Sequence, residues 1–258
     1  MMGKVIAISN QKGGVGKTTT SVNLAAALAE KKKKVLLIDF DPQASTTASL
    51  GIQRELSGNI YQVLLDQKEI EDVIVELERF NLDLLPAAIN LAYLEVDSES
   101  VDRNLLLFNH LKKIKQEYDY ILIDCPPSLG LLTLNALYAS DAVLIPMQCN
   151  FLAIDGLTQL LNTIRIVQKD LRVNNRELLI EGVLLTMLDK RYKHHWETIN
   201  EIKGYFGKDV FKTIITTNVA AQIAPTYGLT ILAYDTKAAS AKLYRSLASE
   251  VIKKNERR

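Results

Sequence analysis

Short apolar runs alternate along the chain with longer segments in which apolar residues recur every three or four positions. The runs are typical of buried parallel strands, and the periodic segments are typical of amphipathic helices. The predicted strands cover residues 4–9, 34–39, 82–85, 119–124, 141–146 and 179–186. The predicted helices cover residues 18–31, 103–117, 129–139, 156–169, 195–206 and 238–253. The alternation predicts a single α/β domain over residues 1–258, with a mostly parallel twisted sheet and helices on both faces.

A glycine-rich loop, KGGVGKTT over residues 12–19, separates the first predicted strand from the first predicted helix. Glycines let the backbone pass close to phosphate oxygens, and a helix N-terminus adds partial positive charge. We expect Lys17 to reach the β- and γ-phosphates and the Thr18 hydroxyl to hold Mg²⁺. The predicted nucleotide-binding residues of the loop are Lys12, Gly13, Gly14, Val15, Gly16, Lys17, Thr18 and Thr19.

This loop departs from the usual phosphate-loop pattern G-x-x-x-x-G-K-[ST]. The pattern would place glycine at position 11, where the chain has Gln11, and the loop carries the additional Lys12. It is therefore a deviant Walker A loop of a P-loop NTPase. The alternative is a glycine-rich turn without a ligand, which the order of strand, loop and helix disfavours.

Carboxylates end two other predicted strands. Asp39 and Asp41 follow the apolar run at residues 35–38, and Asp124 follows the run at residues 120–123. The carboxyl ends of parallel strands border the crevice where such sheets bind ligands. We expect Asp124 to hold Mg²⁺ through water, because this cation keeps part of its hydration shell. The alternative for any one of these residues is a helix cap.

Composition and charge narrow the class of protein. The two cysteines, Cys125 and Cys149, lie in or beside apolar strands, so we expect buried packing residues in a reducing compartment. No apolar run approaches the roughly 18 residues of a membrane span. The net charge of +1 hides an asymmetry: residues 1–150 carry −5 and residues 151–258 carry +6. A basic second half, ending in the basic tail 251–258, can face an acidic polymer, although a solvated face explains scattered lysines equally well.

Four stretches together resemble the ParA/Soj branch of the MinD/ParA family of deviant Walker ATPases, and they lie at residues 11–20, 39–43, 121–130 and 181–189. The resemblance implies a slow ATPase that dimerises around two ATP molecules and Mg²⁺. It implies that the dimer binds DNA without sequence preference and is stimulated by a ParB-type partner in chromosome or plasmid segregation. We expect a cytoplasmic, nucleoid-associated protein without membrane attachment.

The same resemblance assigns roles to individual residues. Lys12 is expected to cross to the other subunit's nucleotide, and Asp41 to orient the attacking water, so Lys12, Lys17 and Asp41 are the predicted catalytic residues. A lysine delivered in trans can neutralise charge as an arginine finger does. Asn218 is the candidate for contacting adenine.

The chain departs from its relatives where they are basic. The family reads R-N-V-R-L-S-E-A-P where this chain has TNVAAQIAP at residues 217–225, so Thr217 and Ala220 are neutral. We expect DNA binding that is weaker than typical, because each lost phosphate contact weakens it, or that is carried by a shifted patch. The predicted DNA-binding residues are Lys190, Arg191, Lys193, Lys237, Lys242 and Arg245.

Alternatives remain open on the sequence. A MinD-like protein that positions division machinery on membranes needs a terminal amphipathic basic helix, which the last eight residues lack. An iron–sulfur carrier needs cluster-bridging cysteines, and no C-x-x-C occurs. A module that keeps nucleotide only as structural glue would not need Lys12, Lys17 and Asp41. His194 and His195 are expected to be an exposed polar pair rather than metal ligands, and Trp196 a packing residue.

Overall fold

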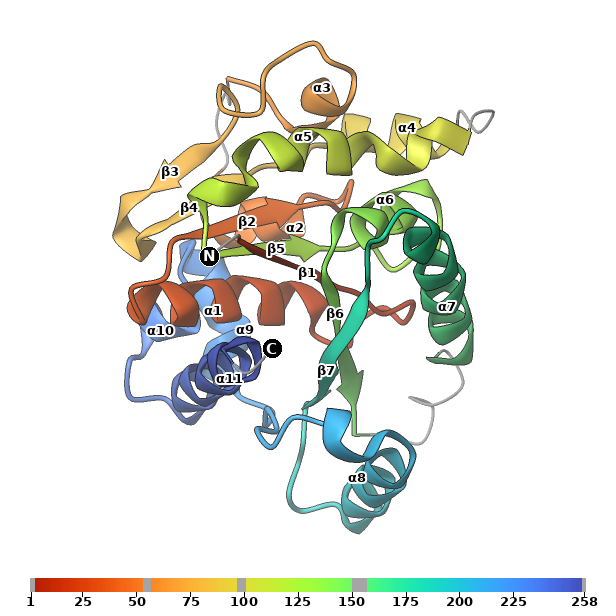
Figure 1. Ribbon diagram of the computed structural model, residues 1–258. Helices are drawn as coiled ribbons and strands as arrows, with labels where there is room; N and C mark the ends of the chain where they lie inside the picture. The colour runs from red at the N-terminus through yellow and green to blue at the C-terminus, as the bar shows by residue number, and fades with distance from the viewer. Residues whose placement is uncertain (1–2, 53–56, 97–100, 150–156, 257–258) are drawn as a thin grey trace.

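The computed structural model describes residues 3–52, 57–96, 101–149 and 157–256. It contains a seven-stranded sheet in the order β3-β4-β2-β5-β1-β6-β7, in which every neighbouring pair is parallel except β3 and β4 (Figure 1). The strands are β1 (Lys4–Ile8), β2 (Val35–Asp39), β3 (Val75–Leu77), β4 (Leu82–Leu85), β5 (Tyr120–Asp124), β6 (Ala142–Gln148) and β7 (Leu179–Thr186). The predicted fold class is confirmed.

Helices cover both faces of this sheet (Figure 1). The longer helices are α1 (Lys17–Glu30), α5 (Leu106–Ile114), α6 (Leu131–Ala139), α7 (Leu157–Val173), α8 (Lys193–Phe206) and α11 (Ala239–Asn255). Short helices are α2 (Ser45–Ser49), α3 (Ile60–Leu64), α4 (Tyr93–Val96), α9 (Val219–Ile223) and α10 (Ile231–Tyr234). Short 3-10 segments, such as Ala224–Tyr227 after α9, join several of them.

Because successive side chains of a strand point to opposite faces of the sheet, the apolar residues of β1 pack in two different cores. Val5 and Ala7 pack in the core under α5, α6 and α7. Ile6 and Ile8 pack in the core under α1 and α11. β1 is therefore buried on both faces at the centre of the sheet, and its carboxyl end opens into the loop that leads to α1.

Element boundaries follow the predictions within a few residues, with instructive exceptions. The predicted helix at 103–117 is a shorter α5 between two 3-10 segments, and α7 extends four residues beyond its predicted end. Position 156, its predicted first residue, lies outside the described residues. Residues 251–253, which belong both to the last predicted helix and to the predicted basic tail, lie in α11, which continues to Asn255. Residues 257 and 258 of that tail lie outside the described residues. Within the described ranges, no helix is long and apolar enough to cross a membrane.

Candidate functional site

The glycine-rich loop turns tightly between β1 and α1. Gly14 and Gly16 have φ of 71° and 87°, which side-chain-bearing residues rarely adopt. Val15 between them is 1% exposed and anchors the loop in the protein. The loop thus delivers the chain to the first turn of α1, where partial positive charge attracts anions.

Two lysines meet in this loop. The Lys17 side chain is largely buried, and its Nζ donates to the carbonyl oxygen of Lys12 at 3.2 Å. Burial lowers the pKa of Lys17, and the negative charge of Asp124 opposes that shift. The Lys12 backbone N–H donates to Asn10 Oδ1 at 3.0 Å, and Asn10 Nδ2 donates to the carbonyl oxygen of Pro146 in β6 at 2.7 Å. Loop and sheet are therefore joined through Asn10.

The ends of β6 and β7 brace the same loop. Gln148 Nε2 donates to the Gly14 carbonyl oxygen at 2.8 Å. The Thr186 hydroxyl lies within hydrogen-bond distance of the carbonyl oxygens of Val15 (2.9 Å) and Met147 (3.0 Å). Sequence reasoning missed Gln148 and Thr186, because only the strand order places β6 and β7 beside the loop.

Asp124 is fully buried at the end of β5 and accepts three hydroxyl hydrogen bonds. Its partners are Thr18 Oγ1 (2.8 Å), Ser21 Oγ (2.9 Å) and Thr46 Oγ1 (2.7 Å). Burial raises the pKa of Asp124, while the three hydroxyls and the Lys17 ammonium favour its ionised form. Thr18 and Asp124, predicted to share a metal site from positions 106 residues apart, are thus in direct contact. Ser21 and Thr46 were not predicted.

Two further carboxylates, Asp39 and Asp41, lie at the end of β2 and just after it. Asp39 is fully buried and accepts from the Thr47 N–H and hydroxyl, both at 2.7 Å, and from the Asp41 N–H at 3.3 Å. Burial and then the neighbouring Asp124 raise the pKa of Asp39 to about 7. Asp41 is half-buried, and its Oδ1 accepts from the Gln43 N–H at 2.9 Å. Asp39 thus fixes the backbone that carries Asp41.

These donors fit a magnesium nucleotide better than a metal held by protein ligands alone. Within the described part of the chain, no group of three His, Cys, Asp or Glu residues could hold a metal ion. The hydroxyl of Thr18 and the carboxylate of Asp124 supply oxygen donors beside the phosphate loop. Mg²⁺ binds through few protein ligands, waters and substrate phosphates, so this sparse donor set suits it.

Asn218 lies in the segment between α8 and α9, where it is the N-cap of α9. Its Oδ1 accepts from the Ala221 N–H at 3.2 Å, while the N–H of Thr217 donates to the Leu188 carbonyl oxygen at 3.1 Å. Ala221 lines a small hollow together with Thr19 and other residues at the start of α1. The segment proposed to face the base is therefore adjacent to the phosphate loop.

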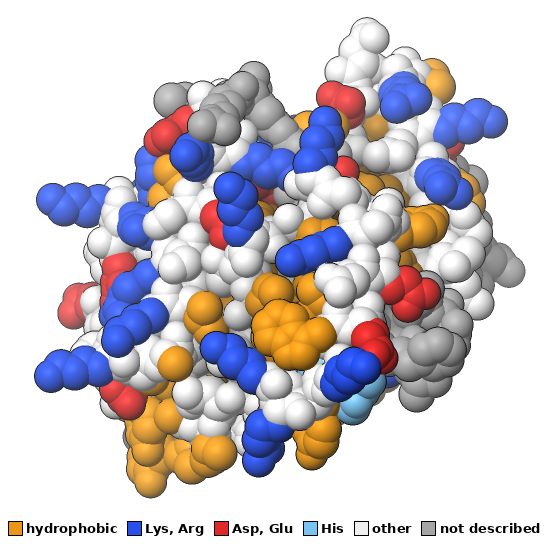
Figure 2. Space-filling model, turned by 90° about the horizontal axis from the view of Figure 1, so that it is seen from below, with side chains coloured by type: hydrophobic (Ala, Val, Ile, Leu, Met, Phe, Trp, Pro, Cys, Tyr) orange, Lys and Arg blue, Asp and Glu red, His pale blue; other side chains and the backbone are white. Residues whose placement is uncertain are grey.

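The six predicted DNA-binding cations fall into two groups. Lys190, Arg191 and Lys193 lie between β7 and the first turn of α8, and Lys237, Lys242 and Arg245 lie at the start of α11 or just before it. All are exposed except Arg245, which is half-buried. The face that includes α8 and α11 carries cations scattered among apolar and acidic side chains (Figure 2). It is not a continuous basic patch.

Three of these cations are already paired with carboxylates. Arg191 Nη2 lies 2.6 Å from Asp189 Oδ2, and Arg245 Nε lies 2.6 Å from Glu30 Oε2 on α1. The Lys193 ammonium is 3.7 Å from the Glu197 carboxylate. The structure therefore reduces the charge that the predicted patch presents.

Of three other expectations, two are revised and one is confirmed. Trp196 is 43% exposed, so the prediction that it is a packing residue is wrong. His195 is half-buried, and its Nδ1 accepts from the Asp189 N–H at 3.1 Å, so only His194 is the exposed polar residue that was expected. Cys125 and Cys149 are free and buried as predicted, and burial raises the pKa of both thiols.

A large hollow lies elsewhere, at the opposite edge of the sheet. Lys34, Asn81 and Tyr118, which precede β2, β4 and β5, are among the residues that line it. Opposite charges line it together, and none of the predicted site residues reaches it. The predicted phosphate-binding and metal-binding residues lie instead at the carboxyl ends of the strands.

Known proteins match the chain over most of its length. Residues 3–180 match the model of a family described as an AAA domain. The chain is 52% identical to the sporulation initiation inhibitor protein Soj of Bacillus subtilis, covering 97% of this chain and 98% of that protein. It is 44% identical to the chromosome partitioning protein ParA of Myxococcus xanthus, covering 98% and 89%.

Solved structures share the fold. A cobyrinic acid a,c-diamide synthase from Mycobacterium smegmatis with bound ADP and magnesium has a TM-score of 0.85 at 35% identity, covering 99% of this chain and 96% of that one. A putative plasmid partition protein from Borrelia burgdorferi bound to AMPPNP has a TM-score of 0.81 at 30% identity, covering 98% and 99%. Nucleotide binding is thus recorded for similar chains on the same architecture.

Proposed function

Because this chain belongs to the ParA/Soj family of chromosome-partitioning ATPases, we propose that it forms an ATP-dependent sandwich dimer that binds DNA without sequence preference. In this proposal a ParB-type partner stimulates slow ATP hydrolysis, which separates the subunits and drives the segregation of a chromosome or plasmid. The observation that carries it is the contact of Thr18 with buried Asp124 beside Lys17, at the first turn of the helix that follows the phosphate loop.

In this proposal the loop residues 12–19 bind the phosphates, and Asn218 contacts the adenine. The Lys17 ammonium moves from the Lys12 carbonyl oxygen to the β- and γ-phosphates, which offer it a stronger, charged acceptor. Thr18 binds Mg²⁺ directly, and Asp124 holds it through water. The bound Mg²⁺ supplies neutralisation of the charge on the phosphates.

Assembly and hydrolysis depend on two further residues in the proposal. Lys12, at the start of the loop, reaches the partner subunit's nucleotide and stabilises the charge that develops on its phosphates. Asp41 orients the attacking water, and its placement depends on the hydrogen bond from its own N–H to Asp39. Loss of the γ-phosphate removes negative charge that both lysines bind, so the subunits separate.

DNA binding is proposed to use the exposed lysines and arginines at the start of α8 and of α11. Neutral residues at Thr217 and Ala220 remove cations that relatives carry. Three of the proposed cations are paired with carboxylates, namely those of Asp189, Glu197 and Glu30. We therefore expect weaker binding than is typical of the family, with a shallow salt dependence.

The assembly step is tested by light scattering coupled to size-exclusion chromatography, with ATP or with ADP. Wild-type protein is expected to double in mass with ATP only, and Asp41→Ala to remain dimeric because hydrolysis is lost. Lys17→Ala is expected to stay monomeric because it cannot hold the triphosphate. Identical profiles for the two variants in ATP would contradict the proposal.

The DNA step is tested separately by titrating duplex DNA into the ATP-bound protein at low salt. Binding that is independent of sequence and declines with salt is expected. Absence of binding below tens of micromolar protein would refute this part while leaving the nucleotide cycle intact.

A further inference from the structure

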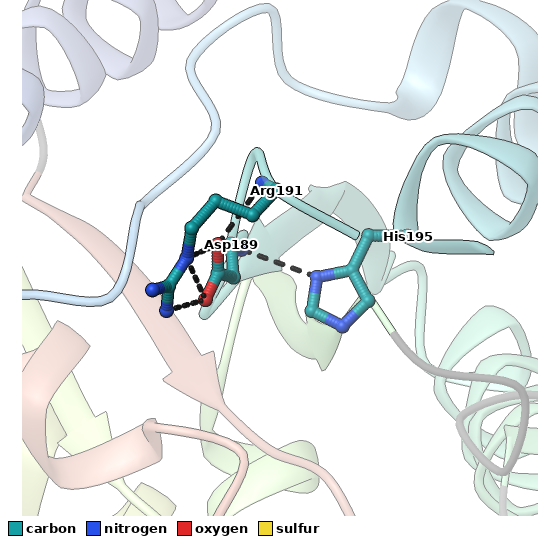
Figure 3. Close-up of polar contacts among 3 residues, drawn as sticks. All are labelled: Asp189, Arg191 and His195. Atoms are coloured by element: carbon teal, nitrogen blue, oxygen red, sulfur yellow. Dashed lines mark hydrogen bonds and ion pairs between the residues drawn. The ribbon is translucent and has the colours of Figure 1, made fainter. Parts of the chain in front are cut away.

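The turn between β7 and α8 is held by hydrogen bonds within the turn and by hydrogen bonds to the start of α8 (Figure 3). The N–H of Tyr192 donates to the Asp189 carbonyl oxygen at 3.2 Å, and the N–H of Asp189 donates to His195 Nδ1 at 3.1 Å. The indole Nε1 of Trp196 donates to the Lys190 carbonyl oxygen at 3.5 Å. His195 and Trp196, near the start of α8, thus hold the turn through hydrogen bonds that do not involve the Arg191 side chain.

That arginine, Arg191, is folded against the first residue of the turn. Its Nε lies 2.9 Å from Asp189 Oδ1 and 3.2 Å from Oδ2, and its Nη2 lies 2.6 Å from Oδ2. The Arg191 backbone N–H also donates to Oδ1 at 3.0 Å. These bonds, those of the guanidinium foremost, lower the pKa of Asp189 to about 2, so the carboxylate stays ionised at neutral pH.

Exposure shows which partner faces solvent. The Arg191 side chain is 82% exposed and the Asp189 side chain 18% exposed. A phosphate approaching Arg191 therefore meets the guanidinium with a carboxylate directly behind it. The pair has no net charge, and the repulsion from the carboxylate acts within the Debye length of about 8 Å.

We propose that Asp189 is an internal counter-ion that restrains DNA binding by Arg191, so that this turn is set for weak phosphate binding. The inference rests on the proposed DNA-binding function and identifies a residue that limits its strength. Non-specific affinity comes from cations that release counterions from DNA, and a guanidinium that already holds a carboxylate contributes little of that gain.

The test is a double-mutant cycle in the protein, in which the affinity of each variant for duplex DNA is measured. A non-hydrolysable analogue holds the protein in the ATP state. Asp189→Asn removes the charge and keeps an oxygen that can accept the Arg191 N–H, so the turn is retained. We expect it to bind more tightly than wild type at low salt, and the slope of log K against log salt to steepen by about 0.9. When salt rises from 50 to 200 mM, the fold loss of affinity should be roughly 3.5 times greater for the variant than for wild type.

Two comparisons separate this effect from a general gain of positive charge. Asp189→Asn introduced into Arg191→Ala should change affinity much less than it does in wild type. Glu201→Gln removes one exposed charge from α8. Among the described residues no ion pair includes Glu201, so this variant should have the smaller effect on affinity. Circular dichroism melting verifies that each variant is folded.

Each outcome decides the matter. Equal effects of Asp189→Asn in the presence and absence of Arg191 would overturn the inference. Weaker binding by Asp189→Asn that depends on Arg191 would also overturn it, because Asp189 would then support the arginine. If wild type binds DNA and the cycle shows no coupling, only this inference fails. If neither wild type nor Asp189→Asn binds, the proposed DNA function fails with it.

Discussion

Replacing Thr47 with valine tests how the buried carboxylate of β2 is kept in place. The Thr47 hydroxyl donates to Asp39 Oδ2 at 2.7 Å and accepts from the Ala87 N–H at 3.2 Å. Both Thr47 and Asp39 are buried. Valine has nearly the same shape but neither donates nor accepts, so it leaves one buried donor without a partner and the carboxylate with one fewer hydrogen bond.

The expected cost is large for so small a change. A hydrogen bond to a charged group contributes about 1.5–3 kcal/mol, and a buried unsatisfied group costs about 1–3 kcal/mol. Since partial relaxation reduces both, we expect Thr47→Val to lower the free energy of unfolding of the nucleotide-free protein by about 2–4 kcal/mol at pH 8.

The cost should depend on pH. The pKa of Asp39 is raised to about 7 in the fold, mainly by burial, against 3.8 ordinarily. Its favourable contribution is therefore complete below pH 4 and is lost as pH rises through 7. The Thr47 hydroxyl favours the ionised form, so its removal raises this pKa further. For each unit by which the pKa rises, the loss in the free energy of unfolding caused by Thr47→Val should be up to about 1.4 kcal/mol larger at pH 8 than at pH 5.

Urea unfolding at pH 5, 6, 7 and 8 measures this difference. The matched control is Thr133→Val, because Thr133 is also buried but donates to a neutral acceptor, the Ser128 carbonyl oxygen, at 2.6 Å. The control should destabilise by the same amount at every pH. A Thr47→Val effect that is constant across this range, or that parallels the control, would refute the argument from the Asp39 charge.

Three further substitutions examine separate parts of the chain. Gly16→Ala should weaken nucleotide binding in calorimetric titrations and destabilise by more than about 1 kcal/mol, because φ is 87° there. Arg176→Ala should lower the free energy of unfolding by about 2 kcal/mol, since its guanidinium lies 3.7 Å from the Phe108 ring centroid and donates to the Tyr138 carbonyl oxygen at 2.5 Å. Arg245→Ala should cost less than about 1 kcal/mol in urea unfolding, because its ion pair to α1 is partly exposed. A larger loss than for Arg176→Ala would contradict that ranking.

The sequence was sufficient to locate the long elements and to predict that side chains at the strand ends meet the glycine-rich loop. Six parallel strands carry continuous apolar runs and six helices carry apolar periodicity, and these patterns locate them within a few residues. β3, by contrast, has three residues and pairs antiparallel at the sheet edge. Helices α2, α3, α9 and α10 have four or five residues, fewer than two turns, so no period can be detected in them.

The site divides in the same way. That Lys17, Thr18 and Asp124 lie together was predictable, because the motif and the ends of strands mark them. Gln148 and Thr186 were not, because their role depends on β6 and β7 lying next to β1 in space. The pairing of Arg191 with Asp189 was also missed, although the two residues are only two positions apart, because a surface rotamer leaves no pattern in sequence.

The short helix α2 explains why the two buried carboxylates coexist. Asp39 and Asp124 are register partners on β2 and β5, so two negative charges compete for one dry environment. Thr46 and Thr47, adjacent in α2, each direct a hydroxyl to one of them, at 2.7 Å in both cases. Asp39 accepts hydrogen bonds from both ends of the segment from Asp41 to α2. A change in the charge of Asp124 alters its hydrogen bond from Thr46 in α2, and so displaces the backbone that positions Asp41. The proposed metal contact and the proposed water-orienting residue are therefore mechanically linked through two threonines, without a direct contact between the carboxylates.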